Sequence, residues 1–106
     1  MTLPLRKHRP VRDPDFLKWV RAHIGICCIC EKRPAVEPHH YGEDACLGRK
    51  GSDHVVCAAC RECHGKYQGK RYWGFIRSGE VEVLAAMQRN TIELLSRRLE
   101  GMNNVS

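Results

Sequence analysis

No stretch of this sequence is apolar enough to suggest a membrane span, since none approaches the roughly 20 residues that a spanning helix needs. The first ten residues include Arg6, Lys7 and Arg9, but no apolar segment follows them as it would in a secretory signal. The chain also has no internal repeat and no low-complexity tract. We therefore expect a cytoplasmic protein without a membrane partner, in a reducing compartment that keeps cysteine thiols free.

The chain is also too short to bury a large core, with only 106 residues. A domain of this size is often stabilised by a disulfide or a metal ion, and seven cysteines and six histidines are candidates for that role. Residues 1–12 are basic and contain proline, so we expect an N-terminal arm there. Residues 13–106 are expected to form a single domain.

Acidic residues are fewer than basic ones, 12 against 18, which gives a formal net charge of +6. A basic balance suits a polyanionic partner such as nucleic acid. Alone, this is a weak signal.

Local patterns predict an α+β fold. Asp13 and Pro14 are typical of a helix start, and Gly25 would end that helix. Residues 35–40 and 54–58 are expected to be two strands of a hairpin, followed by a helix that begins near Cys60.

A long helix is expected from about residue 80 to 99. One of its faces carries apolar residues for core packing or for pairing with a second copy in a homodimer: Val81, Leu84, Ala85, Ile92, Leu95 and Leu99. Trp73 and Phe75 are expected to pack against this helix.

Two Cys-x-x-Cys pairs are the strongest signal, Cys27 with Cys30 and Cys60 with Cys63. Zinc takes four ligands in a tetrahedron, and two such pairs can supply them. We expect a structural Zn²⁺ that contributes much of the folding free energy. Other sets stay open, because Cys28 could replace Cys27 and Cys57 forms a competing pair with Cys60. Cys46 has no evident partner.

Histidines accompany these cysteines. His39 and His40 are neighbours on a strand and should point to opposite faces, so one could bind a metal while the other reaches a water molecule. His64 follows Cys63 on a helix and should face a different side from it. Asp53 could approach the same place, whereas His54 should face away from Asp53 if both lie on a strand.

The order of these residues resembles the HNH endonuclease superfamily, whose active unit is a ββα-metal fold with a treble-clef-like zinc site. The similarity to small phage and prophage members, including the RecA-dependent recombination enhancement function nuclease, covers roughly residues 12–75. It rests on the segments Arg12 to Val20, Pro38-His39-His40, Gly48-Arg49-Lys50-Gly51-Ser52-Asp53, Cys60-Arg61-Glu62-Cys63-His64 and Gly69 to Trp73.

The resemblance implies phosphodiester cleavage of DNA that leaves 3′-hydroxyl and 5′-phosphate ends. His40 would be the general base, and Asp53 would occupy the middle position and orient that base or its loop. His39 and His64 would bind a catalytic divalent ion, which could be Mg²⁺, Mn²⁺, Ni²⁺ or Zn²⁺. Many relatives have a further histidine four residues after the last one, where this chain has Gln68, a weak neutral ligand.

DNA contact is expected from basic residues around this unit, in addition to those of the arm: Arg49, Lys50, Lys66, Lys70 and Arg71. Two other functions compete with the nuclease. One is a non-catalytic zinc module that binds DNA or a recombinase, and the other is an interaction protein that dimerises through the long helix.

Overall fold

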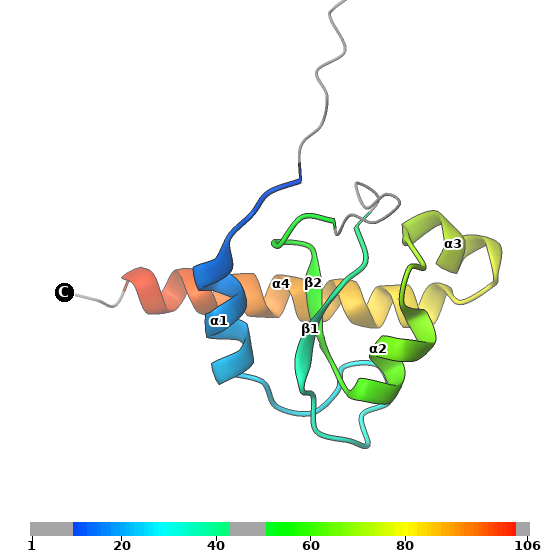
Figure 1. The fold of residues 1–106 in the computed structure, drawn as a ribbon, viewed down its shortest axis with the longest axis horizontal. Coiled ribbons are helices and arrows are strands. Elements are labelled where there is room, and N and C mark those ends of the chain that lie inside the picture. The colour runs from blue at the N-terminus through cyan, green and yellow to red at the C-terminus, as the bar shows by residue number, and fades with distance from the viewer. Residues whose placement is uncertain (1–9, 43–50, 104–106) are drawn as a thin grey trace, which may run out of the picture.

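The computed structural model describes residues 10–42 and 51–103, which form four helices and one two-stranded sheet. The elements are α1 (Pro14–Ala22), β1 (Glu37–His40), β2 (Val56–Ala59), α2 (Arg61–Tyr67), α3 (Tyr72–Arg77) and α4 (Val81–Asn103). The expected α+β class is confirmed. Figure 1 shows α4 running along the length of the molecule, with α1 and the hairpin lying across it and α3 near the end where α4 begins.

Helix α1 begins where the sequence indicates. The Asp13 carboxylate accepts a hydrogen bond from the Phe16 backbone N–H at 3.0 Å, and Pro14 is in the first turn, where it loses no helical hydrogen bond. The helix ends at Ala22, three residues before the expected Gly25. Its amphipathic face buries Phe16 against the hairpin and α4.

Strands β1 and β2 pair in antiparallel register, with His39 opposite Cys57 and His40 opposite Val56. The hairpin is confirmed, but β2 begins at Val56 and not at His54. Every residue of β2 is buried, because the strand lies between the neighbouring elements and α4. The hairpin therefore fixes the position of the adjacent histidines within a packed framework.

The long helix is confirmed, and Leu84 of its predicted apolar face is buried, as expected for core packing. Val81, Ile92 and Leu99 of that face are more than half exposed, with Ile92 at 65%, so they are not part of the core of this chain. The other buried residues of α4 are Met87, Thr91 and Leu94.

Thr91 explains this difference. Its hydroxyl lies 2.7 Å from the Val56 carbonyl oxygen and 2.6 Å from the Tyr41 hydroxyl, so its polar atom is satisfied in the core. A prediction based on the spacing of apolar residues does not include threonine. A threonine whose hydroxyl is hydrogen-bonded can nevertheless be buried with little loss of free energy.

Helix α3 was not anticipated as an element. It packs Phe75 against Leu84 and Met87 of α4, as expected for Phe75. Trp73, however, is 53% exposed, so less than half of its surface is available for the expected packing against the long helix. Within the described ranges, no helix is both long enough and apolar enough to cross a membrane.

Candidate metal centre and histidine cluster

Four cysteines converge where the loop after α1 meets the start of α2. The sulfur atoms of Cys27, Cys30, Cys60 and Cys63 all lie within 4.8 Å of one another. Cys30 Sγ and Cys60 Sγ are 3.9 Å apart, close to the roughly 3.8 Å edge of a tetrahedron with Zn–S bonds of about 2.3 Å. The group can therefore hold a structural metal such as zinc.

Local backbone geometry forms each half of this centre. In the first half, the Glu31 N–H donates to the Cys27 carbonyl oxygen at 3.0 Å, and Glu31 has the left-handed φ of 55° that turns the chain back. In the second half, Cys60 caps α2, and the Cys63 N–H points at its sulfur at 3.4 Å. Each Cys-x-x-Cys spacing thus places two sulfur atoms on one side of a tight turn.

Backbone N–H groups favour the thiolate form at two of these positions. Hydrogen bonding from the Lys32 backbone lowers the pKa of Cys30 to about 6, although burial opposes the shift. The Cys63 backbone N–H likewise lowers the pKa of Cys60. Burial raises the pKa of the Cys63 thiol, so loss of its proton is favoured when a cation binds the sulfur in place of that proton.

The alternative ligands lie outside the four-sulfur group. Cys57 lies in β2, and the half-buried Cys28 packs against the core cluster that contains Cys57. Interaction with the Cys28 side chain and burial raise the pKa of Cys57 well above its ordinary value. Cys46 lies outside the described residues. Among the described residues, the four cysteines form the only close cluster of three or more Cys, His, Asp or Glu ligands.

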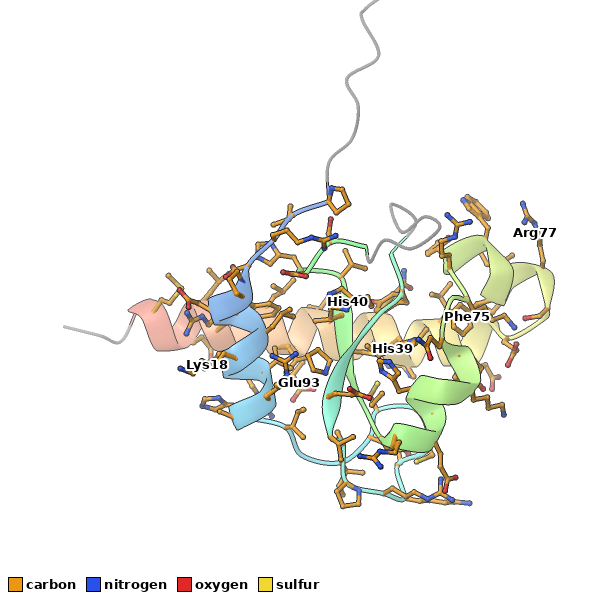
Figure 2. The ribbon with its side chains drawn as sticks, viewed as in Figure 1. Lys18, His39, His40, Phe75, Arg77 and Glu93 are labelled. Atoms are coloured by element: carbon orange, nitrogen blue, oxygen red, sulfur yellow. The ribbon has the colours of Figure 1, made fainter. Side chains whose placement is uncertain are left out.

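His39 and His64 meet from β1 and α2 beside the sulfur centre. Their ring centroids are 4.9 Å apart, and Figure 2 shows His39 between the hairpin and α2. Both ring nitrogens of His39 and Nδ1 of His64 are buried without a hydrogen-bond partner in the described part of the chain. Burial and the neighbouring histidines lower the pKa of His39 to about 4, so its ring is neutral at pH 7 and able to bind a metal.

Glu37 is a site residue that the sequence analysis missed. Its Oε1 lies 3.5 Å from His64 Nδ1. Glu37 precedes His39 by two residues on β1, so strand alternation places both on the same face. The spacing of two residues between Glu37 and His39 on a predicted strand is the sequence feature from which Glu37 could have been predicted.

His40 points elsewhere, as the alternation on β1 predicts. Its Nε2 lies 2.9 Å from Asp53 Oδ1, while the other carboxylate oxygen accepts the Asp13 backbone N–H at 2.6 Å. Burial alone raises the pKa of Asp53, but these hydrogen bonds and the nearby Arg12 outweigh it and hold the pKa below 3.8. Asp53 is therefore a buried carboxylate that fixes the His40 ring.

Replacing Asp53 by Asn is expected to lower the free energy of unfolding by about 1–3 kcal/mol, because a buried donor then faces an amide N–H₂. Urea unfolding of the metal-loaded protein measures this. Asp13→Asn is the matched control: Asp13 is more exposed, pairs with His54 Nε2 at 2.9 Å, and caps a helix as well when it is Asn. We expect the control to lose less than about 1 kcal/mol. Equal losses would contradict the special role of Asp53.

His54 does not behave as expected. Neither it nor Asp53 lies on β2, and both reach residue 13 at the start of α1 rather than facing apart. Its ring also meets Phe16 edge-on, with centroids 5.5 Å apart. The prediction of opposed side chains assumed that both residues lie on a strand, and the strand starts two residues after His54.

The remaining predicted site residues have varied surroundings. Gln68 is exposed at the C-terminal cap of α2. Lys70 forms an ion pair with Glu80, and the Lys66 ammonium lies 5.2 Å from the centroid of the Tyr67 ring. Arg71 is exposed at the start of α3. Arg49 and Lys50 lie outside the described residues, as does most of the N-terminal arm.

Comparison with protein-family models, with curated proteins and with solved structures gives no match for this chain.

Proposed function

We propose that this protein is a metal-dependent DNA endonuclease of the HNH type, acting in phage or prophage DNA processing or recombination. The observation that carries this proposal is the pair His39 and His64: neither ring nitrogen of His39 has a hydrogen bond among the described residues, and the buried Nδ1 of His64 has only the ion-pair contact with Glu37 at 3.5 Å. Buried polar atoms without a partner cost free energy, so their retention indicates a ligand. The resemblance to HNH proteins supplies the reaction class.

The donor set suits a divalent transition metal. His39 and His64 provide two neutral imidazoles, and Glu37 lies next to His64 as a further ligand or as the carboxylate that orients it. Imidazole favours Ni²⁺ or Zn²⁺, whereas Mg²⁺ favours oxygen ligands. A bound ion of this kind supplies electrostatic stabilisation to the charged phosphate in the transition state. We expect Ni²⁺ to support cleavage better than Mg²⁺ does.

His40 is the proposed general base. Its Nε2 lies 2.9 Å from the Asp53 carboxylate, which holds the imidazole in one orientation as a base for an attacking water. Asp53 orients the ring and stabilises the imidazolium that forms. His40 and the metal ligand His39 are consecutive residues of β1, so one strand positions both the base and a ligand of the ion.

DNA would be held by basic side chains near α2 and α3. Lys66 and Arg71 are exposed there, and a net charge of +6 favours a polyanion. Lys70 must break or share its ion pair with Glu80 to contact a phosphate, so we assign it a smaller part.

The test is binding of a second ion, followed by plasmid cleavage. The zinc-loaded protein is titrated with Ni²⁺ by calorimetry, and nicking is then assayed with Ni²⁺, Mn²⁺ and Mg²⁺. We expect one additional Ni²⁺ per chain and metal-dependent nicking. His64→Ala should lose both, and Glu37→Gln should weaken Ni²⁺ binding by about 10–100-fold.

Glu62→Gln is the matched control, because Glu62 lies on the same helix as His64 but pairs with Arg33 at an exposed position. It should bind Ni²⁺ as the wild type does. A wild-type protein that binds no second ion and does not nick DNA with any metal would overturn the proposal.

A second candidate is a non-catalytic zinc module that binds DNA or a recombinase. It is favoured by the exposed Gln68 at the end of α2, where many relatives have a histidine ligand, and by the lack of a second close cluster of three ligands in the described segments. A gel shift of DNA without cleavage would support this function. Co-purification with a recombinase would show that the zinc module also binds this protein partner.

A further inference from the structure

The last residues of the predicted N-terminal arm lie against the segment that carries Asp53. The Val11 N–H donates to the Ser52 hydroxyl at 3.0 Å, and the Asp53 N–H donates to the Val11 carbonyl oxygen at 2.9 Å. The Val11 side chain is 44% exposed, so polar groups and not apolar burial hold this contact. Residues 41 positions apart in the sequence are thereby joined next to the proposed general base.

Both oxygen atoms of the Asp53 carboxylate are held by this end of the arm. Oδ2 accepts the Asp13 backbone N–H at 2.6 Å, and Oδ1 lies 3.4 Å from Nη1 of Arg12. The same Oδ1 lies 2.9 Å from Nε2 of His40. Nη1 of Arg12 also donates to the Gly51 carbonyl oxygen at 2.6 Å, which fixes the guanidinium beside the carboxylate. Arg12 and His40 therefore share one oxygen of an aspartate that is only 4% exposed.

We propose that residues 11–13 form a clamp that positions the Asp53–His40 pair, with Arg12 as the positioning residue. A carboxylate that is held through one oxygen can rotate about its Cβ–Cγ bond, whereas contacts on both oxygens fix its plane. A fixed plane gives the His40 ring a single orientation, which a base needs in order to meet an attacking water. The consequence for DNA cleavage rests on the proposed nuclease function, but the effect of the clamp on the orientation of His40 does not.

Arg12 belongs to the basic arm from which the sequence predicts DNA contact, and its side chain is 46% exposed. The two roles have different kinetic effects. A contact with a DNA phosphate stabilises the bound substrate and the transition state alike, so its loss raises KM and leaves kcat unchanged. A residue that orients the base acts on the reaction step, so its loss lowers kcat. The geometry favours positioning, because Nη1 of Arg12 is directed at two protein acceptors, the Gly51 carbonyl oxygen and Asp53 Oδ1.

Steady-state nicking by the zinc-loaded full-length chain, with Ni²⁺ as the metal, separates these effects. We expect Arg12→Ala to lower kcat by about 10–100-fold, less than loss of the base itself, and to leave KM nearly unchanged. Arg12→Lys should recover part of that loss, because an ammonium keeps the charge beside Asp53 without the planar geometry of a guanidinium. Arg97→Ala is the matched control, since it also removes an arginine from an ion pair, here with Glu93 at an exposed position of α4. It should keep the wild-type kcat and KM.

A second measurement follows the clamp without DNA cleavage. ¹H–¹⁵N NMR spectra of the histidine rings, recorded at one fixed pH, report whether the His40 ring has a single environment. We expect one sharp set of His40 ring signals in the wild type and in Arg97→Ala. Arg12→Ala should shift or broaden these signals, because its His40 ring exchanges between orientations. Zinc content and the helical circular dichroism signal show that each variant is folded.

Unchanged His40 ring signals in a folded Arg12→Ala variant would overturn the clamp. So would an unchanged kcat in that variant, and a raised KM alongside it would assign Arg12 to DNA contact instead. If Arg12→Ala does not fold, Arg12→Lys is subjected to the same two measurements with the same criteria. If the wild-type protein cuts no DNA with any metal, the nuclease proposal fails, and the His40 ring signals alone decide whether the clamp stands.

Discussion

Removing zinc with a chelator is expected to unfold most of this protein. Structural zinc contributes roughly 10–16 kcal/mol of apparent binding free energy in small zinc domains, which is as large as the whole net stability of about 5–15 kcal/mol of a typical domain. The four cysteines join the loop after α1 to α2, and together with Ala59 and Ile29 they form a small core cluster of their own. Unfolding is measured as the loss of the helical signal in far-ultraviolet circular dichroism during chelation, with zinc content measured in parallel.

Single substitutions of the cysteines test the ligand set. Cys30→Ser and Cys60→Ser are expected to lose zinc and most of the helical signal, because each removes one of four converging sulfur atoms. Cys28→Ser should retain one zinc per chain, because Cys28 is not one of the four cysteines whose sulfur atoms converge. A Cys28→Ser variant that loses zinc while Cys27→Ser retains it would show that the ligand set is wrong.

Loss of the His40 imidazole is expected to lower the rate of DNA cleavage by about 10²–10⁴-fold, the usual contribution of a positioned general base. The expectation rests on the hydrogen bond to Asp53, which fixes the ring in one orientation. Plasmid nicking by His40→Ala, at a metal concentration that saturates the wild type, measures the effect. Binding of Ni²⁺ should remain close to wild type, since His40 is not a proposed ligand.

His54→Ala is the control for this experiment. His54 also holds a carboxylate at 2.9 Å, but at the start of α1 and away from the His39 and His64 pair. It should cleave DNA at nearly the wild-type rate. Equal losses in the two variants would indicate a general effect of histidine–aspartate pairs on folding and would count against His40 as the base.

Features that depend on a few neighbouring residues were predictable from the sequence. The two Cys-x-x-Cys turns form from local backbone hydrogen bonds, and the start of α1 follows from Asp13 and Pro14. The opposite directions of His39 and His40 follow from strand alternation alone. Each of these features depends on backbone geometry over a few neighbouring residues, so contacts with distant parts of the chain have little influence on it.

The sequence by itself thus determined the two Cys-x-x-Cys pairs and the opposite directions of the His39 and His40 side chains. Only the tertiary structure decided what they meet: Glu37 lies beside His64, and Asp53 lies beside His40. The buried face of α4 also depended on packing, because Thr91 enters the core only when Tyr41 and Val56 supply its hydrogen-bond partners. These contacts join residues up to 50 positions apart, and their geometry is set by how the hairpin lies on α4, which local spacing does not encode.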